Sequence, residues 1–146
     1  MFTSYYIGQW IQNKMSGQGK SHYGNGDMYE GQFLDGKKHG KGRMIWNLKP
    51  GQPFLHAYEG DWKHDQMTGF GREQLASGDV YEGEFWNGRR HGKGRLVMKA
   101  MPGEKFERYY DGEWRSGVKQ GHGREQYATG GYYDGEWLFG SKSGHG

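Results

Sequence analysis

The side chains that could do acid–base chemistry in this chain are carboxylates at short intervals. Glu82 and Glu84 are separated by one residue, and Glu113 and Glu136 occupy matching places further along. Hydrolases use such pairs as general acid and general base. In the register proposed below, strand acids such as Glu82 and Glu84 face Arg or Lys of the next strand, and an opposite charge holds a carboxyl in its ionised form. With no cysteine and no Ser-His-Asp order either, the sequence predicts a protein that is not an enzyme.

Turns rich in lysine and histidine suggest phosphate or metal binding. The segment 36–41, Gly-Lys-Lys-His-Gly-Lys, has three residues between its glycines and no Ser or Thr after the last lysine. A phosphate-binding loop needs four residues and that hydroxyl. His122 and His145 occupy equivalent positions in adjacent copies of a repeat, so we expect about 10 Å between them, too far to share one zinc ion. We therefore expect neither a cofactor nor a metal.

These residues all belong to a repeated motif, which determines how they are positioned. In six copies a Tyr is followed two residues later by Gly and four residues later by Trp or Phe, and a Gly-x-Gly pair comes next. The spacing alternates between 23 and 29 residues, so the larger unit has 52 residues. We expect one repeat domain over residues 1–146, with copies that start at Tyr6, Tyr29, Tyr58, Tyr81, Tyr110 and Tyr133.

Composition excludes an ordinary globular core. Leu, Ile, Val and Phe make up only 19 of 146 residues, a proportion common in disordered chains. Aromatic residues, however, make up 16% of the chain and keep fixed places in the repeat. The core must therefore be thin, aromatic and linear.

Charge and hydropathy limit the classes of partner and the cellular compartment that we expect. The balance of 20 basic and 17 acidic residues is too even for a dedicated nucleic-acid binder, so we expect no nucleic-acid partner. No apolar run approaches the ~20 residues that cross a bilayer, and the N-terminus lacks the features of a signal peptide. We expect an intracellular protein.

The motif predicts a β-strand with two unlike faces. In residues 81–85, Tyr-Glu-Gly-Glu-Phe, aromatic residues and Gly alternate with acids, the period of a strand. The Gly-x-Gly-Arg segment would be its return strand, with residues 86–91 as the turn. One register then pairs Phe85 with Gly92, Glu84 with Lys93, Gly83 with Gly94 and Glu82 with Arg95. The same register pairs Glu30 with Arg43, Glu59 with Arg72 and Asp111 with Arg124.

Turn residues predict how the copies are joined. Gly26-Asp27, Gly78-Asp79 and Gly130-Gly131 mark short connections. The two longer linkers indicate extended hairpins with Pro-Gly tips at residues 49–52 and 101–104. The predicted fold is all-β: an elongated, twisted, single-layer antiparallel meander of about 11–12 strands without significant helix. Its sixth copy is incomplete at Gly146, which leaves a strand edge where another chain could pair.

Two segments carry a resemblance to a known family. Tyr-Glu-Gly-Gln-Phe-Leu-Asp-Gly-Lys-Lys-His-Gly-Lys-Gly at 29–42 and Tyr-Glu-Gly-Glu-Phe-x-Asn-Gly-Arg-Arg-His-Gly-Lys-Gly at 81–94 closely resemble the MORN repeat (membrane occupation and recognition nexus). The resemblance covers residues 6–146, although Asn13 and Asp65 replace the turn glycine in two copies. It implies an elongated single-sheet scaffold with an aromatic groove. Such repeats occur in ciliary radial-spoke proteins, junctophilins and apicomplexan cytoskeletal proteins, and beside phosphoinositide-kinase or methyltransferase domains.

Three sets of residues are candidate binding surfaces. The first is the aromatic face, unless its rings only fill the core: Tyr29, Phe33, Tyr58, Trp62, Tyr81, Phe85, Tyr110, Trp114, Tyr133 and Trp137. The second is the pair of extended hairpins, unless they only pack on each other: Trp46, Phe54, Met98, Met101 and Phe106. The third is an edge for anionic lipid or an acidic partner, unless it is a solvated edge that opposes aggregation: Lys37, Lys38, His39, Arg89, Arg90 and His91.

We expect a non-catalytic structural scaffold that docks other proteins of a larger assembly. The resemblance to radial-spoke-type MORN proteins makes a ciliary axonemal complex of the cytoskeleton the first expected location. Two alternatives stay open. One is a phosphoinositide-binding adaptor between membrane and cytoskeleton, and the other is a regulatory arm of a kinase or methyltransferase that continues beyond residue 146.

Overall fold

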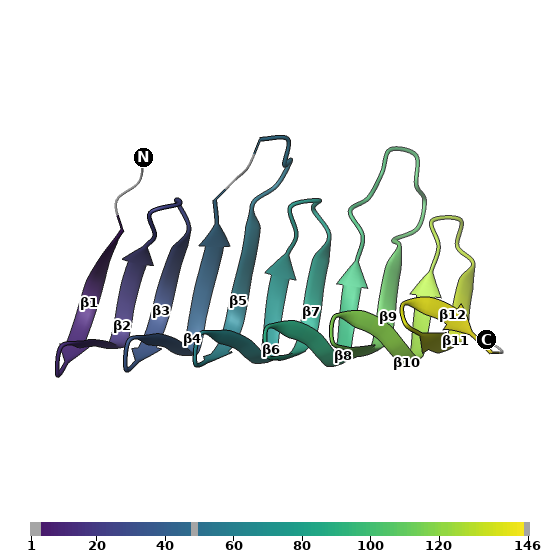
Figure 1. Ribbon diagram of the computed structural model, residues 1–146. Helices are drawn as coiled ribbons and strands as arrows, with labels where there is room; N and C mark the ends of the chain where they lie inside the picture. The colour runs from purple at the N-terminus through teal and green to yellow at the C-terminus, as the bar shows by residue number, and fades with distance from the viewer. Residues whose placement is uncertain (1–3, 48–49, 145–146) are drawn as a thin grey trace.

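The computed structural model describes residues 4–47 and 50–144, which form one open antiparallel sheet without a helix (Figure 1). Twelve strands pair in chain order, so the sheet is a meander, as predicted. The strands are β1 (Tyr5–Ile11), β2 (Lys14–His22), β3 (Met28–Leu34), β4 (Lys37–Trp46), β5 (His56–Lys63), β6 (Gln66–Gln74), β7 (Val80–Trp86), β8 (Arg89–Val97), β9 (Tyr109–Arg115), β10 (Val118–Gln126), β11 (Tyr132–Leu138) and β12 (Ser141–Ser143).

The tight turns inside the six copies share one conformation. Asp35 and Gly36 both have positive φ, at 50° and 81°, as type I′ hairpins require. Asn13 and Asp65 replace the glycine in two copies, yet they adopt the same left-handed conformation with φ of 64° and 65°. Asn and Asp tolerate this region better than other residues with a side chain. The copies therefore turn alike despite their different sequences.

Each even-numbered strand up to β10 carries a bulge that the sequence did not reveal. Gly83 faces Gly94 as predicted, but the next pair is Phe85 with Arg90. Two residues of β7 thus span the same step as four residues of β8. The predicted pairing of Phe85 with Gly92 is wrong, because Gly92 has a φ of 81° and turns the strand.

A side chain of the preceding strand stabilises each bulge. Glu84 does not face Lys93 as predicted; its Oε2 instead accepts a hydrogen bond from the Lys93 backbone N–H at 2.7 Å. Gln32 makes the same contact with the Lys41 N–H at 2.6 Å. The remaining acceptor and donor pairs are Gln9 with Gln18, Asp61 with Phe70, and Glu113 with His122.

The bulge folds the hairpin end of each copy over one face of the sheet. Neighbouring hairpins are hydrogen-bonded to each other: the Gly36 N–H donates to Met15 O and the Gly88 N–H to Met67 O, both at 3.0 Å. Figure 1 shows the lower ends of the even strands curling away from their upper parts. We call the face that carries the repeat Tyr and Trp or Phe residues the inner face, and the opposite one the outer face.

The inner face carries a continuous aromatic core. The Tyr29 ring meets Phe33 of its own copy at 4.9 Å and Trp62 of the next copy at 5.4 Å between centroids, both nearly perpendicular. The same zigzag runs from Trp10 to Tyr133. Edge-to-face pairs of this kind contribute about 0.5–1.5 kcal/mol each beyond their burial. The core is therefore thin, aromatic and linear, as composition required.

Glycines of the motif leave room for the tyrosine rings. Gly31 faces Gly42 across the ladder, and the Tyr29 ring lies over the pair. A Cβ atom added to Gly42 would collide with the Tyr29 ring, and one added to Gly31 would collide with the Gly42 backbone. The Tyr29 hydroxyl can then donate to Gln32 O at 2.8 Å. This close approach explains why Gly recurs on both strands.

The two long linkers are loops and not the predicted extended hairpins. The flanking strands stop on both sides, so residues 47, 50–55 and 98–108 lie outside the regular ladder. Asp79 redirects the second linker, because its Oδ1 accepts a hydrogen bond from the Lys99 N–H at 2.8 Å. Asp27 does the same for the Asn47 N–H. Each linker is thereby tied to the neighbouring turn.

The Pro-Gly turn at residues 101–104 is present. The Glu104 N–H donates to Met101 O at 3.2 Å, and Gly103 has a φ of 84°. At the equivalent tip Gly51 has a φ of 83°, while Lys49 lies outside the described residues. Figure 1 shows both loops on the edge of the sheet opposite the tight hairpins.

Candidate interaction surfaces

The predicted aromatic face is the core of the protein. Tyr29, Tyr58, Tyr81 and Tyr110 are 0% exposed, and the five Trp and Phe residues of the set are at most 5% exposed. Only Tyr133 is half-buried. Burial raises the pKa of these four tyrosines well above the usual 10.0. The structure thus supports the interpretation that the rings fill the core, and direct binding of a partner to them stays a prediction.

The predicted basic edge divides into inward and outward residues. The Lys38 and Arg90 side chains are only 16% and 19% exposed, because they fold over the aromatic core. Lys38 Nζ lies 5.3 Å from the Trp62 ring centroid, and Arg90 Cζ lies 5.2 Å from that of Trp114. Through these cation–π contacts the two cationic groups stabilise the folded core.

Lys37 and Arg89 are the exposed members of the basic edge, whereas His39 and His91 are half-buried. His91 Nδ1 accepts a hydrogen bond from the Ser116 N–H at 3.3 Å. Any contact with lipid or an acidic protein at this edge would therefore fall to Lys37 and Arg89.

Exposed apolar residues accompany these cations. Leu34 (44% exposed) faces Lys37, and Trp86 (60% exposed) faces Arg89. We call the row of tight turns with these pairs the hairpin edge. The sequence analysis predicted the cations of this edge but not its apolar side chains. Leu34 and Trp86 occupy the same alternate positions of their strands as the polar residues of the outer face, so no separate pattern marks them.

A half-exposed row lies on the inner face just beyond the core. It has one residue on or immediately after each return strand, so its members are spaced about 10 Å apart. The residues are Tyr23, Trp46, Leu75, Met98 and Tyr127. We call the strip of the inner face between this row and the folded-over hairpins the inner groove. A hollow of about 360 Å³ within it is lined by residues that include Trp46, Met44, Met67 and Lys38.

The inner groove contains two of the predicted hairpin residues, Trp46 and Met98. Sequence reasoning missed Tyr23, Leu75 and Tyr127. The sequence does carry a signal for them, because in the first five copies this residue is the fourth after the second glycine of the Gly-x-Gly pair.

A buried acid, Glu73, and a half-buried acid, Glu125, alternate with apolar residues beneath the groove. Glu73, 8% exposed, lies 2.8 Å from His56 Nε2 and 3.7 Å from Arg90 Nε. Glu125 lies 3.3 Å from both Lys119 Nζ and Lys142 Nζ. The rim of the groove is therefore apolar, and the negative charges beneath it are paired with basic side chains of the same chain.

The other predicted hairpin residues pack on neighbouring turns. The Phe54 ring covers Gly78 of the next copy, where an added Cβ would lie 2.8 Å away. Phe106 covers Gly130 in the same way. Met101 and Phe106 are both exposed, at 55% and 49%. The two phenylalanines therefore fix the linkers, and a partner contact by these three residues stays a prediction.

The outer face carries a row of alternating charges. The four predicted acid–base pairs are confirmed, and each charge also faces an opposite charge on its other neighbour strand. From β2 to β11 this charge ladder reads Lys20, Glu30, Arg43, Glu59, Arg72, Glu82, Arg95, Asp111, Arg124 and Asp134. Glu30, Glu59 and Asp111 are exposed, and within the described residues Arg72 and Glu82 are the only two ladder members within ion-pair distance of each other, at 3.4 Å.

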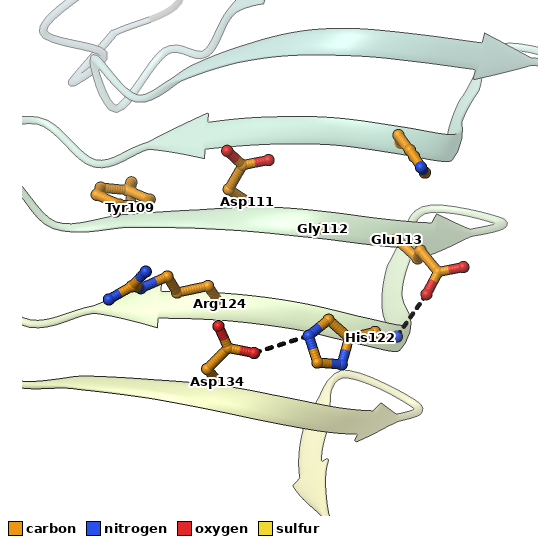
Figure 2. A pocket seen from close by; sticks show the side chains of 8 residues that line it. Tyr109, Asp111, Gly112, Glu113, His122, Arg124 and Asp134 are labelled. Carbon is orange, nitrogen blue, oxygen red and sulfur yellow. Dashed lines mark hydrogen bonds and ion pairs between the residues drawn. The ribbon is translucent and has the colours of Figure 1, made fainter. Parts of the chain in front are cut away.

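Figure 2 shows one end of this face, a shallow hollow of about 540 Å³. Asp111 and Arg124 stand beside each other on adjacent strands, and His122 Nε2 lies 2.7 Å from Asp134 Oδ1. The hollow is open and lined by charges of both signs, which suits a broad contact better than an enclosed small molecule.

In residues 4–47 and 50–144, no three His, Cys, Asp or Glu side chains are grouped to hold a metal ion. The same residues include no helix long and apolar enough to span a membrane.

Comparison with known proteins identifies the repeat. The family model of the MORN repeat matches residues 6–28, 29–47, 58–80, 81–98, 110–132 and 133–146, which begin at the six repeat tyrosines. Alsin from Homo sapiens is 34% identical over 118 residues, which cover 81% of this chain but 7% of that protein. MORN repeat-containing protein 3 from Xenopus laevis is 37% identical over 82 residues, 52% of this chain and 32% of that protein. ALS2 C-terminal-like protein from Homo sapiens is 30% identical over 101 residues, 69% of this chain and 10% of that protein. The matched part is thus a minor portion of each relative.

Proposed function

This chain belongs to the MORN-repeat family, and we propose that it is a non-catalytic docking module that holds a partner protein along its inner groove. The observation that carries the proposal is the half-exposed apolar row of the groove, one residue per return strand. The rings of the core are buried within the chain itself, so the groove row is the apolar part of the inner face that a partner can reach.

The geometry favours an extended partner segment. Groove residues recur about every 10 Å, and an extended chain advances about 3.3 Å per residue. In the polyproline II form, with three residues per turn and about 3.1 Å per residue, every third side chain lies on one face about 9 Å from the last, so an apolar residue at every third position would match this spacing. Trp46 and Met98, which are equivalent residues of the two 52-residue units, would hold two points about 20 Å apart.

The groove is tested by comparing a double variant, Trp46→Ala with Met98→Ala, with a matched control at the hairpin edge, Leu34→Ala with Trp86→Ala. Tagged chains are purified from cells, and co-purifying proteins are quantified. We expect the groove variant to lose partners that the control retains, while both keep the far-ultraviolet circular dichroism of the parent. Equal recovery of the same partners by both variants would refute the groove as the docking site.

The assembly that we propose is a ciliary axonemal complex of the radial-spoke type, where rigid ribbons of repeats serve as scaffolds. The resemblance to radial-spoke-type MORN proteins supports this location. The tagged chain, expressed in ciliated cells, should remain with axonemes after detergent removes the membrane. Complete release into the detergent-soluble fraction would argue against an axonemal scaffold.

The hairpin edge supports a second candidate function, docking to anionic lipid surfaces. Exposed Trp86 and Leu34 lie beside Arg89 and Lys37, so apolar insertion and electrostatic attraction coincide. Each basic residue near an anionic surface contributes about 1 kcal/mol. Vesicles containing a phosphoinositide should pellet the parent chain at physiological salt but not the variant Lys37→Glu with Arg89→Glu. Absence of pelleting for the parent would eliminate this function.

A further inference from the structure

We propose that the outer face is a self-association surface, on which a second copy of this chain packs with its strands in reversed order. The charge ladder has ten members that alternate in sign without interruption from Lys20 to Asp134. Because the row has an even number of members, it begins with a positive charge and ends with a negative one. A second copy laid against it in reversed order therefore presents the opposite charge at every position. Each positive residue then faces a negative residue of the second copy.

The matching symmetry is a two-fold axis that runs parallel to the strands between β6 and β7. Arg72 would face Glu82 of the second copy, and Arg43 would face its Asp111. The remaining facing pairs are Glu59 with Arg95, Glu30 with Arg124, and Lys20 with Asp134. Such a contact is isologous, the commonest arrangement in protein dimers.

The row beside the ladder, nearer the hairpin edge, fits the same axis. Its charged residues include Lys41, Asp61, Lys93 and Glu113, on β4, β5, β8 and β9. The axis brings Lys41 opposite Glu113 and Asp61 opposite Lys93, so the signs again agree. Two pairs of opposite charge in this second row thus agree with the operation that the ladder selects, whereas the same axis places the uncharged Phe70 opposite Glu84 and Gln18 opposite Glu136.

The row on the other side of the ladder is largely apolar and supplies the desolvated part of the contact. It includes Ile45, Ala57, Val97 and Tyr109. The same axis places Ile45 opposite Tyr109 and Ala57 opposite Val97. Burial of such pairs contributes roughly 25 cal/mol per Å² of apolar surface.

Other arrangements are disfavoured by the same alternation. A two-fold axis along the ladder keeps the order of strands and places each charged residue opposite the same residue of the second copy. A shift by one strand likewise brings like charges together, which is repulsive. A uniformly acidic or basic partner would meet attraction and repulsion in equal measure. A second copy with reversed order satisfies every position of the charge ladder.

The area is adequate for a stable dimer. Ten strands about 4.8 Å apart and three rows that each take up about 7 Å occupy a face of roughly 1,000 Å². A standard interface takes about 800 Å² from each partner.

The test separates contacts within a copy from contacts between copies. Arg43 on β4 and Asp111 on β9 are five strands, or about 24 Å, apart in one chain, yet they face each other in the dimer. Sedimentation equilibrium should show a dimer for the parent. We expect Arg43→Glu and Asp111→Arg each to raise the dimer dissociation constant about tenfold or more, because each places two like-charge pairs in the interface.

The double variant, with Arg43→Glu and Asp111→Arg together, should restore the dimer. Lys63→Glu, the same change of charge on an exposed residue outside the ladder, is the control and should leave the dimer intact. A parent chain that stays monomeric at high concentration, or a double variant no better than the single ones, would overturn the proposal. The groove variant with Trp46→Ala and Met98→Ala should still dimerise, so the failure of one proposal does not imply the failure of the other.

Discussion

The two faces of one sheet have opposite roles although their residues alternate along the same strands. Tyr81 is 0% exposed and touches Phe85 and Trp114, whereas the side chain of its neighbour Glu82 is 56% exposed. The inner face is covered by the folded-over hairpins of the same chain. Within residues 4–47 and 50–144 no segment covers the outer face in this way, so its regular pattern is available to other molecules. The difference shows that a single-layer sheet of repeats can bury a core on one face and leave its other face exposed.

The largest expected effect on the inner face comes from alkaline pH. Because the folded pKa of Tyr29, Tyr58, Tyr81 and Tyr110 lies above the unfolded value of 10.0, the folded state holds their protons more tightly. Their contribution to stability is complete below pH 10.0 and falls above it, by up to about 1.4 kcal/mol per pH unit for each ring. Urea unfolding at about pH 8 and about pH 11 measures the loss. Tyr81→Phe should make the decline shallower.

Phenolate absorbance gives the corresponding check. Of the eleven tyrosines, the four core rings should ionise only together with unfolding. Ionisation of all tyrosines near the ordinary pKa, with the sheet still folded, would mean that the inner face is open.

Removal of a single core ring should have the next largest effect. Tyr81→Ala deletes a fully buried ring and its contacts to two copies, so we expect a loss of about 3–5 kcal/mol in the free energy of unfolding. Glu82→Ala, one residue away on the outer face, should change it by no more than about 0.5 kcal/mol. Urea denaturation followed by tryptophan fluorescence compares the two. Similar losses would contradict the division between faces.

A methyl group added beneath a ring should be less damaging. In Gly94→Ala the new Cβ would collide with the Tyr81 ring, so we expect a loss of about 1–3 kcal/mol. Gly131→Ala is the matched control, because its Cβ would make an ordinary contact with Tyr127 at 3.8 Å. Thermal unfolding should distinguish the two variants, and equal midpoints would show that the Gly-x-Gly pair has no steric role.

The smallest expected effect concerns the bulge. Glu84→Ala leaves the Lys93 N–H without its acceptor and should lower stability by about 1 kcal/mol. Glu84→Gln should be nearly neutral, since Gln32 serves the same purpose in another copy. Hydrogen exchange of the Lys93 amide should accelerate in the alanine variant alone. An unchanged rate would mean that the bulge does not depend on this side chain.

These comparisons show which features a sequence of this kind reveals. Strict alternation in residues 81–85 predicted the two faces, and the recurring Glu and Arg predicted the cross-strand charge pairs such as Glu82 with Arg95. Local pattern is sufficient there because neighbouring strands are neighbours in sequence. The bulge was not predicted, because Gly92 has the same identity as Gly94 although one turns the strand and the other makes room for a ring.

The candidate surfaces were predicted less completely for a related reason. Lys37 and Lys38 are identical in sequence, yet one is exposed and the other covers the core, a difference that the bend of the strand imposes. The linkers departed from extended hairpins because Asp27 and Asp79 accept hydrogen bonds about 20 residues away. Such contacts have no counterpart in the local sequence pattern.

The central claim is that the core rings are closed and the groove row is the accessible apolar part of the inner face. Hydroxyl-radical footprinting by mass spectrometry, applied to the free chain and to the chain with its co-purified partner, tests this directly. We predict that Tyr29, Tyr58, Tyr81 and Tyr110 stay protected in both states, while Trp46 and Met98 are oxidised in the free chain and protected in the complex. Rapid oxidation of the four tyrosines in the free chain, with protection only in the complex, would contradict the account.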